Sequence, residues 1–306
     1  MAIQDELKKS EDYKIGKVSK DSELAEITQD NVARIEAMIS IDSDYKKSAM
    51  CIPPKIWTYK NGGKEHQKGE QEIEFRGSTC YWMRRLNETF VPLNKRTTGL
   101  IGCTKQGKAL VEVWEKALLD EIINVKSNNS VGYSLEIALY GAISAVDREN
   151  GTHLTSDQND DNPDGNGRIE LTHRLYKKVV KGGDLRAILK DRNCGFELIE
   201  ELRKTTKGGR ENYSFATKFC HYASFYFYEG KDAQDNYSIY DDVLGKNLPE
   251  YAREYLNKPY SKDNFQNYDR YSTIIDRIRE AAALRYNEQQ VSRNGFDHLL
   301  WYYHKG

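Results

Sequence analysis

The chain has 306 residues, enough for about two domains of ordinary size. It carries 46 Lys and Arg residues against 47 Asp and Glu residues, a formal net charge of −1, which excludes a uniformly basic nucleic-acid coat and an acidic tail. The hydrophobic fraction of 38% and the interspersed charges are typical of a folded globular chain rather than a disordered one.

The sequence predicts a cytoplasmic protein with no membrane partner. Its apolar runs fall short of the roughly 18 residues that a membrane span needs, and its first residues lack the apolar stretch of a signal peptide. The five cysteines are scattered and contain no C-x-x-C pair, so we expect neither a disulfide framework nor a structural zinc ion. The sequence implies no cofactor and no protein partner.

Residues 1–105 are interpreted as a first, mixed and irregular N-terminal region. Its short strand candidates are Lys55–Tyr59 and Glu72–Phe75, separated by Asn61-Gly62-Gly63 and a polar stretch.

Residues 106–306 are interpreted as a second, helical domain, so the fold class is mainly α. One apolar stripe at helical spacing, Leu110 to Val125, runs across about five turns. Further helices are predicted at Ser134–Val146, Leu171–Lys181, Asp184–Lys190, Phe196–Thr205, Tyr213–Tyr228, Leu248–Leu256, Tyr271–Leu284 and Phe296–Tyr303.

A carboxyl-rich loop, Asp160–Glu170, resembles the first half of an EF-hand calcium loop. Neither possible register closes with the required glutamate, because the twelfth position is Leu171 in one and His173 in the other. The simpler interpretation is an Asx-rich turn before a helix capped near Thr172.

The most informative stretch is Tyr213–Tyr228, an apolar helix that must be buried and that contains one lysine, Lys218. Burial disfavours an ammonium ion and lowers the pKa of a lysine, which favours the nucleophilic amine. The structural alternative is a lysine whose amine reaches solvent at the helix end or pairs with a carboxylate.

Asp241 can return to the neighbourhood of Lys218. The helix rises about 15 Å from Lys218 to its end, and the dozen residues that follow can span about 40 Å. An aspartate held there can orient a nucleophile or stabilise a cationic intermediate. The structural alternative is an N-cap of the helix beginning near Val243, a role that also suits Asp242.

The strings Ser214–Tyr222 and Ile239-Tyr240-Asp241 resemble the helix-hairpin-helix DNA glycosylases, most closely their 8-oxoguanine-glycosylase-like branch. The similarity covers roughly Phe196–Leu256 and extends to bacterial phage-defence proteins of this fold. It implies that Lys218 attacks the sugar C1′ and that Asp241 assists. It also implies a modified base in phage DNA as the target, a glucosylated hydroxymethylcytosine being one candidate.

Two departures from the family concern the hairpin. The family has a glycine-rich run directly before its lysine, whereas Ser214 and Ala216 stand there in this chain. The longer segment Lys207–Asn212 is expected to replace it, with Gly208, Gly209 and Arg210 contacting a DNA phosphate.

Local charge supports a nucleic-acid partner. From Arg76 to Lys108 the basic residues are Arg76, Arg84, Arg85, Lys95, Arg96, Lys105 and Lys108, and the only acid is Glu88, with Tyr81 and Trp82 interleaved. Arg84 and Arg85 are the predicted DNA contacts in this segment. The stretch from Arg174 to Arg210 is also basic, and a solvated helix face explains it equally well.

A flipped base needs aromatic or apolar walls. Tyr222 and Trp301 are the candidates for this base pocket, with Phe296 a further one, although the C-terminal rings around it are expected mainly to pack in the core.

These features predict an enzyme that binds double-stranded DNA, flips out a modified base and cleaves its N-glycosidic bond, with strand scission as a second activity if Lys218 is the nucleophile. The alternatives are a DNA-binding protein without catalysis and a calcium-dependent interaction module built on Asp160–Glu170.

Overall fold

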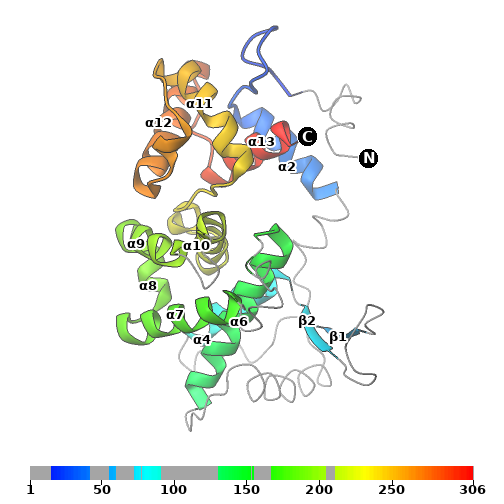
Figure 1. Cartoon of the computed structure of the whole chain (residues 1–306). Coiled ribbons are helices and arrows are strands. Elements are labelled where there is room, and N and C mark those ends of the chain that lie inside the picture. Colours follow the sequence, from blue (N-terminus) through cyan, green and yellow to red (C-terminus); the bar gives the residue numbers. More distant parts are fainter. Residues whose placement is uncertain are drawn as a thin grey trace. The chain divides into compact units, whose positions relative to one another are not determined.

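The computed structural model describes residues 15–41, 55–59, 72–76, 78–90, 130–152, 154, 167–204 and 211–305. The described chain is mainly helical, which confirms the predicted fold class (Figure 1). It forms two compact units that are interleaved in the sequence. The first contains residues 15–41, 188–204 and 213–305, and the second contains the described residues between 55 and 187 together with residues 211 and 212. The predicted domain boundary at residue 105 lies outside the described residues.

In the second unit, strand β1 (Lys55–Tyr59) pairs antiparallel with β2 (Glu72–Arg76), which confirms both strand predictions. Helices α4 (Thr79–Thr89), α6 (Ser130–Asn150) and α7 (Gly167–Gly182) follow. The helical stripe predicted from Leu110 to Val125 lies outside the described residues.

Helix α4 packs against α6 through a glycine. A Cβ atom added at Gly141 would lie 2.2 Å from the Trp82 ring, so the absence of a side chain lets the indole approach the helix backbone. Trp82 and Tyr81 are both buried. The interpretation of this segment as irregular, with aromatic rings available to nucleic acid, was therefore wrong for residues 79–89, because the rings form the core of this unit.

Helix α7 begins at Gly167, before the predicted cap. Thr172 lies inside the helix, where its hydroxyl donates to the carbonyl of Arg168 at 2.7 Å. Arg168 forms an ion pair with the buried Asp147 at 2.8 Å. The acidic part of the candidate calcium loop, 160–166, lies outside the described residues.

The first unit is built from helices. In chain order they are α2 (Gln29–Ile41), α8 (Leu185–Lys190, which crosses from the second unit), α9 (Arg192–Arg203), α10 (Tyr213–Phe227), η4 (Asp232–Asp235), α11 (Asp242–Leu256), η5 (Lys262–Phe265), α12 (Tyr268–Tyr286) and α13 (Arg293–His304). Side chains cap the N-termini of α9, α11, α12 and α13. The C-caps of α11 and α12 are Asn257 and Asn287, each in the left-handed conformation that asparagine tolerates. Helix α2 was not predicted.

Tyrosine forms part of this core, in a sequence that contains 21 tyrosines. Tyr237, Tyr251, Tyr268 and Tyr271 are fully buried, and their hydroxyl groups bond backbone groups at the end of α8 or in segments outside the helices. A tyrosine ring supplies apolar area, and its hydroxyl satisfies a backbone group that no helix satisfies.

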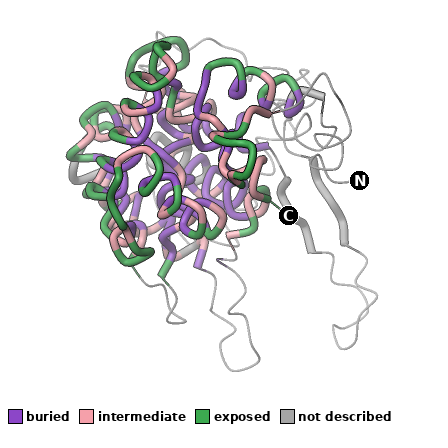
Figure 2. The backbone as a smooth tube through the Cα atoms, turned by 90° about the horizontal axis from the view of Figure 1, so that it is seen from above, coloured by how far each residue is buried: buried purple, intermediate pink, exposed green. Residues whose placement is uncertain are grey.

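Buried positions alternate with exposed ones along the helices, as the purple and green parts of the tube show (Figure 2). Helix α13 packs against α2 and α11 (Figure 1), so the C-terminal helix lies inside the first unit. No described helix is long and apolar enough to cross a membrane.

Candidate active site

Lys218 lies in the middle of α10, on a helix of which 11 of the 15 residues are buried. Its neighbours Thr217 and Phe219 are fully buried, and the Lys218 side chain keeps only 11% of its surface exposed. The prediction of a buried helix is therefore confirmed. Lys218 has a limited opening to solvent, unlike a lysine that extends freely from a helix end.

The chain returns to Lys218 through the extended segment Tyr237–Asp241. Side chains of α10, α12 and α13 replace the hydrogen bonds that a neighbouring strand would supply. The hydroxyl of Tyr268 accepts the N–H of Ser238 and donates to its carbonyl, both at 2.9 Å. Thr217 accepts the N–H of Tyr240 at 3.0 Å. The segment is thereby fixed although it belongs to no sheet.

Asp241 sits where this segment meets α11, and its two carboxylate oxygens have different neighbours. Oδ1 accepts the N–H groups of Val243 and Leu244, both at 3.0 Å, so Asp241 is the N-cap of α11. Oδ2 lies 3.9 Å from the Lys218 amine. Asp242, which the sequence also offered as a cap, is the exposed first residue of the helix.

The two predicted catalytic residues therefore lie next to each other, 23 positions apart in the sequence. At 3.9 Å the carboxylate attracts the ammonium ion, yet the distance exceeds that of a hydrogen bond. The amine is thus held near a negative charge without being bonded to it. A reacting atom that develops positive charge beside Nζ would lie within the field of the same carboxylate.

The pKa of Lys218 is lowered from its usual value near 10.5, and burial is the main cause. The Asp241 carboxylate opposes this change, whereas the positive charge of Lys305 adds to it. A lowered pKa increases the fraction of neutral amine near pH 7, and the neutral amine is the nucleophilic form.

Helix α13 and the residue that follows it bring further groups to the first unit. The side-chain amide of Asn294 lies 3.2 Å from Nε2 of His221, one turn after Lys218. His221 donates from Nδ1 to the carbonyl of Tyr237 at 2.7 Å, and burial lowers its pKa, which favours the neutral imidazole. Near the other end of α13, the Lys305 amine lies 3.7 Å from the centre of the Trp301 ring.

The structure places the two predicted base-pocket residues in the first unit. Tyr222 lies on α10, one turn after Lys218, and is partly exposed with its ring edge-on to His221. Trp301 is partly exposed on α13, edge-on to Tyr302. Phe296 is fully buried, so its packing in the core is confirmed and it is not available to a base.

The predicted DNA contacts are only partly described. Gly208, Gly209 and Arg210 lie outside the described residues. Arg84 and Arg85 are partly exposed on α4 of the second unit, where Arg85 lies 3.6 Å from Glu88.

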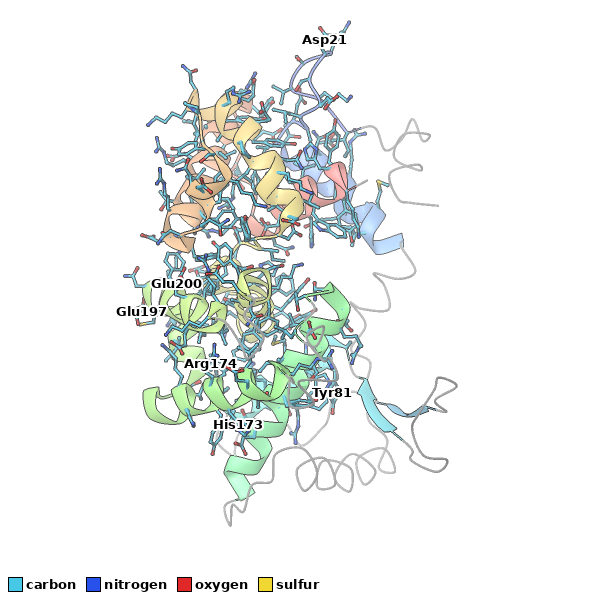
Figure 3. The ribbon with its side chains drawn as sticks, in the orientation of Figure 1. Asp21, Tyr81, His173, Arg174, Glu197 and Glu200 are labelled. Atoms are coloured by element: carbon cyan, nitrogen blue, oxygen red, sulfur yellow. The ribbon has the colours of Figure 1, made fainter. Side chains whose placement is uncertain are left out.

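The basic stretch from Arg174 to Arg210 includes acids that pair with some of its cations. On α9, Arg203 lies 3.8 Å from Glu200, and Lys204 bonds Glu201. Glu197 and Glu200 project from the outer side of the helix (Figure 3). A solvated and internally paired helix face therefore explains the α9 part of this stretch.

Sequence analysis missed Thr217, Asp297 and Lys305. Asp297 is the informative omission, because a buried acid within an aromatic helix is an unusual residue. Asp297 lies three and four residues before Leu300 and Trp301, and this helical spacing indicates that the three residues share a face. The aromatic residues around Asp297 led instead to an interpretation of the whole helix as core packing. Among the described residues no group of three His, Cys, Asp or Glu side chains is placed to hold a metal ion.

Comparison with known protein families, with curated proteins and with solved structures found no match.

Proposed function

We propose that this chain is a DNA glycosylase that excises a modified base flipped out of double-stranded DNA. The observation that carries the proposal is the 3.9 Å approach of Lys218 and Asp241 on a buried helix and its returning segment. A nucleophilic amine beside a carboxylate suits a reaction at C1′ of a sugar, where positive charge develops as the base departs. The resemblance of both strings to the glycosylases adds to this support.

The proposed reaction begins with the neutral amine of Lys218. Its lone pair forms a bond to C1′, the C1′–N bond breaks, and the base leaves with that electron pair and takes up a proton. The amine then loses a proton, the sugar ring opens as O4′ gains one, and a Schiff base joins Nζ to C1′. Loss of a C2′ proton expels the 3′ phosphate, which cuts the strand.

Asp241 has a distinct role in this scheme. Its carboxylate stabilises the positive charge that spreads over C1′ and the ring oxygen. If Lys218 does not attack, a water molecule oriented by Asp241 takes the place of the amine, and the product is an abasic site without strand scission.

The proposal is tested with duplex DNA that contains glucosylated hydroxymethylcytosine and with the same duplex unmodified. Mass spectrometry measures the free base, and borohydride measures the covalent adduct. Wild type is expected to release the modified base. Asp241→Asn is expected to lose about 10²–10³-fold in rate, the range for the loss of one group that stabilises charge in the transition state.

Lys218→Gln separates the two routes. It is expected to form no adduct and to lose excision, whereas Lys246→Gln, which changes an exposed lysine on α11, is expected to behave as wild type. Excision by Lys218→Gln at the wild-type rate, with no adduct in wild type, would exclude the lysine route and leave Asp241 with water.

One observation favours the second candidate, a protein that binds modified DNA without cleaving it. The capping hydrogen bonds of Asp241 already give this residue a structural role. In that case wild type binds modified DNA but releases no base from any duplex tested, and Lys218→Gln binds equally well.

Because the proposed substrate is DNA, the proposal includes a cytoplasmic location for the protein. The described cysteines Cys80, Cys194 and Cys220 are free thiols, in keeping with a reducing compartment.

A further inference from the structure

Asp297 is a buried carboxylic acid whose one observed hydrogen bond reaches the segment that carries Asp241. It lies on α13 and is 3% exposed. Its Oδ2 accepts the N–H of Ile239 at 2.7 Å, and its Oδ1 is buried and has no partner in the described part of the chain. A buried acid is costly to retain, and a leucine of similar volume would pack there without that cost. The hydrogen bond to Ile239 is what a leucine cannot supply.

Among the described residues, Asp297 forms no ion pair that would explain its burial. Burial raises its pKa well above the usual range, and the nearby Asp235 and Asp241 raise it further. The bond from Ile239 and the positive charge of Arg279 oppose this change, and Tyr268 and Tyr271 are further titratable groups that interact with Asp297. The carboxyl therefore favours its protonated form, in which it still accepts the N–H of Ile239.

Ile239 lies two residues before Asp241, and the intervening residue is fixed from the other side. Thr217 on α10 accepts the N–H of Tyr240 at 3.0 Å. Ile239 is thus held by α13, and Tyr240 is held by α10. Because the backbone between Ile239 and Asp241 is extended and short, a shift of Ile239 is passed on to the Asp241 carboxylate.

We propose that Asp297 is a positioning residue, which holds Ile239 so that the Asp241 carboxylate stays 3.9 Å from the Lys218 amine. Its consequence for catalysis rests on the proposed function. Its consequence for the electrostatics of Lys218 does not, because the field of Asp241 acts on the amine whether or not DNA is bound.

The test measures the pKa of Lys218 without DNA. Reductive methylation with ¹³C-formaldehyde labels the lysines, Lys218→Arg assigns the Lys218 resonance, and NMR follows it with pH. The charged groups that act on this amine are Asp241 and Lys305, and both remain in every Asp297 variant. Asp241→Asn is the reference variant. Because it removes an opposite charge close to the amine, we expect it to lower the pKa of Lys218 by about one pH unit or more.

Two variants of Asp297 separate position from charge. Asp297→Asn keeps an oxygen that can accept the N–H of Ile239, and we expect the pKa of Lys218 to stay at the wild-type value. Asp297→Leu removes the acceptor, and we expect the pKa to fall toward that of Asp241→Asn. An unchanged pKa in Asp297→Leu overturns the proposal, and so does a fall in Asp297→Asn equal to that in Asp297→Leu.

General loss of stability is controlled on the same helix. Leu300→Ala empties a fully buried site of α13 and keeps the Asp297 carboxyl that bonds Ile239, and it is expected to lower the unfolding temperature without changing the pKa of Lys218. If Asp297→Leu does not fold, Asp297→Ser replaces it, because a serine hydroxyl is too short to reach Ile239.

Excision measured on the same proteins separates the two proposals. If wild type excises a base, Asp297→Leu is expected to lower kcat with KM nearly unchanged, and Asp297→Asn to restore it. If wild type excises nothing while the pKa follows the expected pattern, the proposed function fails and the positioning role stands. If wild type excises a base and Asp297→Leu keeps both the wild-type kcat and the wild-type pKa, the positioning role alone fails.

Discussion

Thr217, the residue before Lys218, is hydrogen-bonded to the backbone of Tyr240, the residue before Asp241. Its hydroxyl oxygen accepts the N–H of Tyr240 at 3.0 Å and lies 3.3 Å from the carbonyl oxygen of the same residue. Lys218 and Asp241 therefore each come directly after a member of this hydrogen-bonded pair. Thr217 is fully buried and Tyr240 is nearly so. The register between α10 and the returning segment is set by this contact.

Thr217→Val replaces the hydroxyl by a methyl group of similar size and leaves the N–H of Tyr240 buried without its partner. We expect a loss of about 1–3 kcal/mol in the free energy of unfolding, measured by urea titration, because that is the cost of an unsatisfied buried donor. Thr217→Ser keeps the hydroxyl and serves as the control. Equal stability of the valine and serine variants would contradict this account.

Substitutions of Asp241 separate its structural role from its electrostatic one. Asparagine caps a helix about as well as aspartate, whereas alanine at an N-cap costs about 1 kcal/mol. We expect Asp241→Asn to unfold near the wild-type urea midpoint and Asp241→Ala to unfold earlier, while both lower the pKa of Lys218. A large loss of stability in the asparagine variant would mean that the charge, rather than the cap, stabilises α11.

Stability should depend on pH through Lys218. Its pKa is lowered in the folded chain from a value near 10.5, mainly by burial, so the unfolded chain binds more protons between the lowered pKa and 10.5. Stability contributed by this residue therefore rises with pH across that window and is constant below it. We expect the free energy of unfolding of wild type, minus that of Lys218→Met, to increase from pH 7 to pH 10.5. A flat difference would show that the amine has an ordinary pKa.

His304 should control the attachment of the segment before α2 at low pH. The hydroxyl of Tyr251 accepts the N–H of Ala25 and lies 2.9 Å from Nε2 of His304, and burial lowers the pKa of His304 to about 4. The neutral imidazole is favoured in the folded chain, so stability is full above pH 6.5 and is lost as the pH falls toward 4.

The loss is at most about 3 kcal/mol, and smaller to the extent that solvent reaches the ring. Urea titrations of wild type and His304→Asn at pH 7 and pH 4.5 measure it. The asparagine variant is expected to lose less stability between the two values, and a parallel loss in both proteins would assign the effect to other groups.

Gly195 should be intolerant of a side chain. A Cβ atom there would lie 1.8 Å from the hydroxyl of Tyr237, the first residue of the returning segment. We expect Gly195→Ala to destabilise the protein by about 1–3 kcal/mol, as overpacking does, and to reduce any excision activity. Gly245→Ala is the matched control, since its Cβ atom would lie 3.0 Å from the Tyr240 hydroxyl and needs only a small adjustment.

Local patterns in the sequence were sufficient for most of the described helices. The apolar residues of α10 and α12 recur at helical spacing, and β1 and β2 were predicted nearly to the residue. Helices α2 and α4 were missed because their apolar residues are mixed with polar ones, so burial is decided by packing partners far away in the sequence. Tyr81 and Trp82 illustrate the difficulty, since an aromatic residue looks the same in a core and in a binding surface.

From the sequence alone, Lys218 was identified as a lysine on a buried helix, and chain length alone showed that Asp241 was within reach of it. Reach is a property of the chain, whereas the distance of 3.9 Å is decided by contacts between distant elements. The hydrogen bonds that Ile239 donates to Asp297 and Tyr240 donates to Thr217 join positions 58 and 23 residues apart. No local pattern encodes such contacts, because they exist only once burial has brought α10, α13 and the returning segment together.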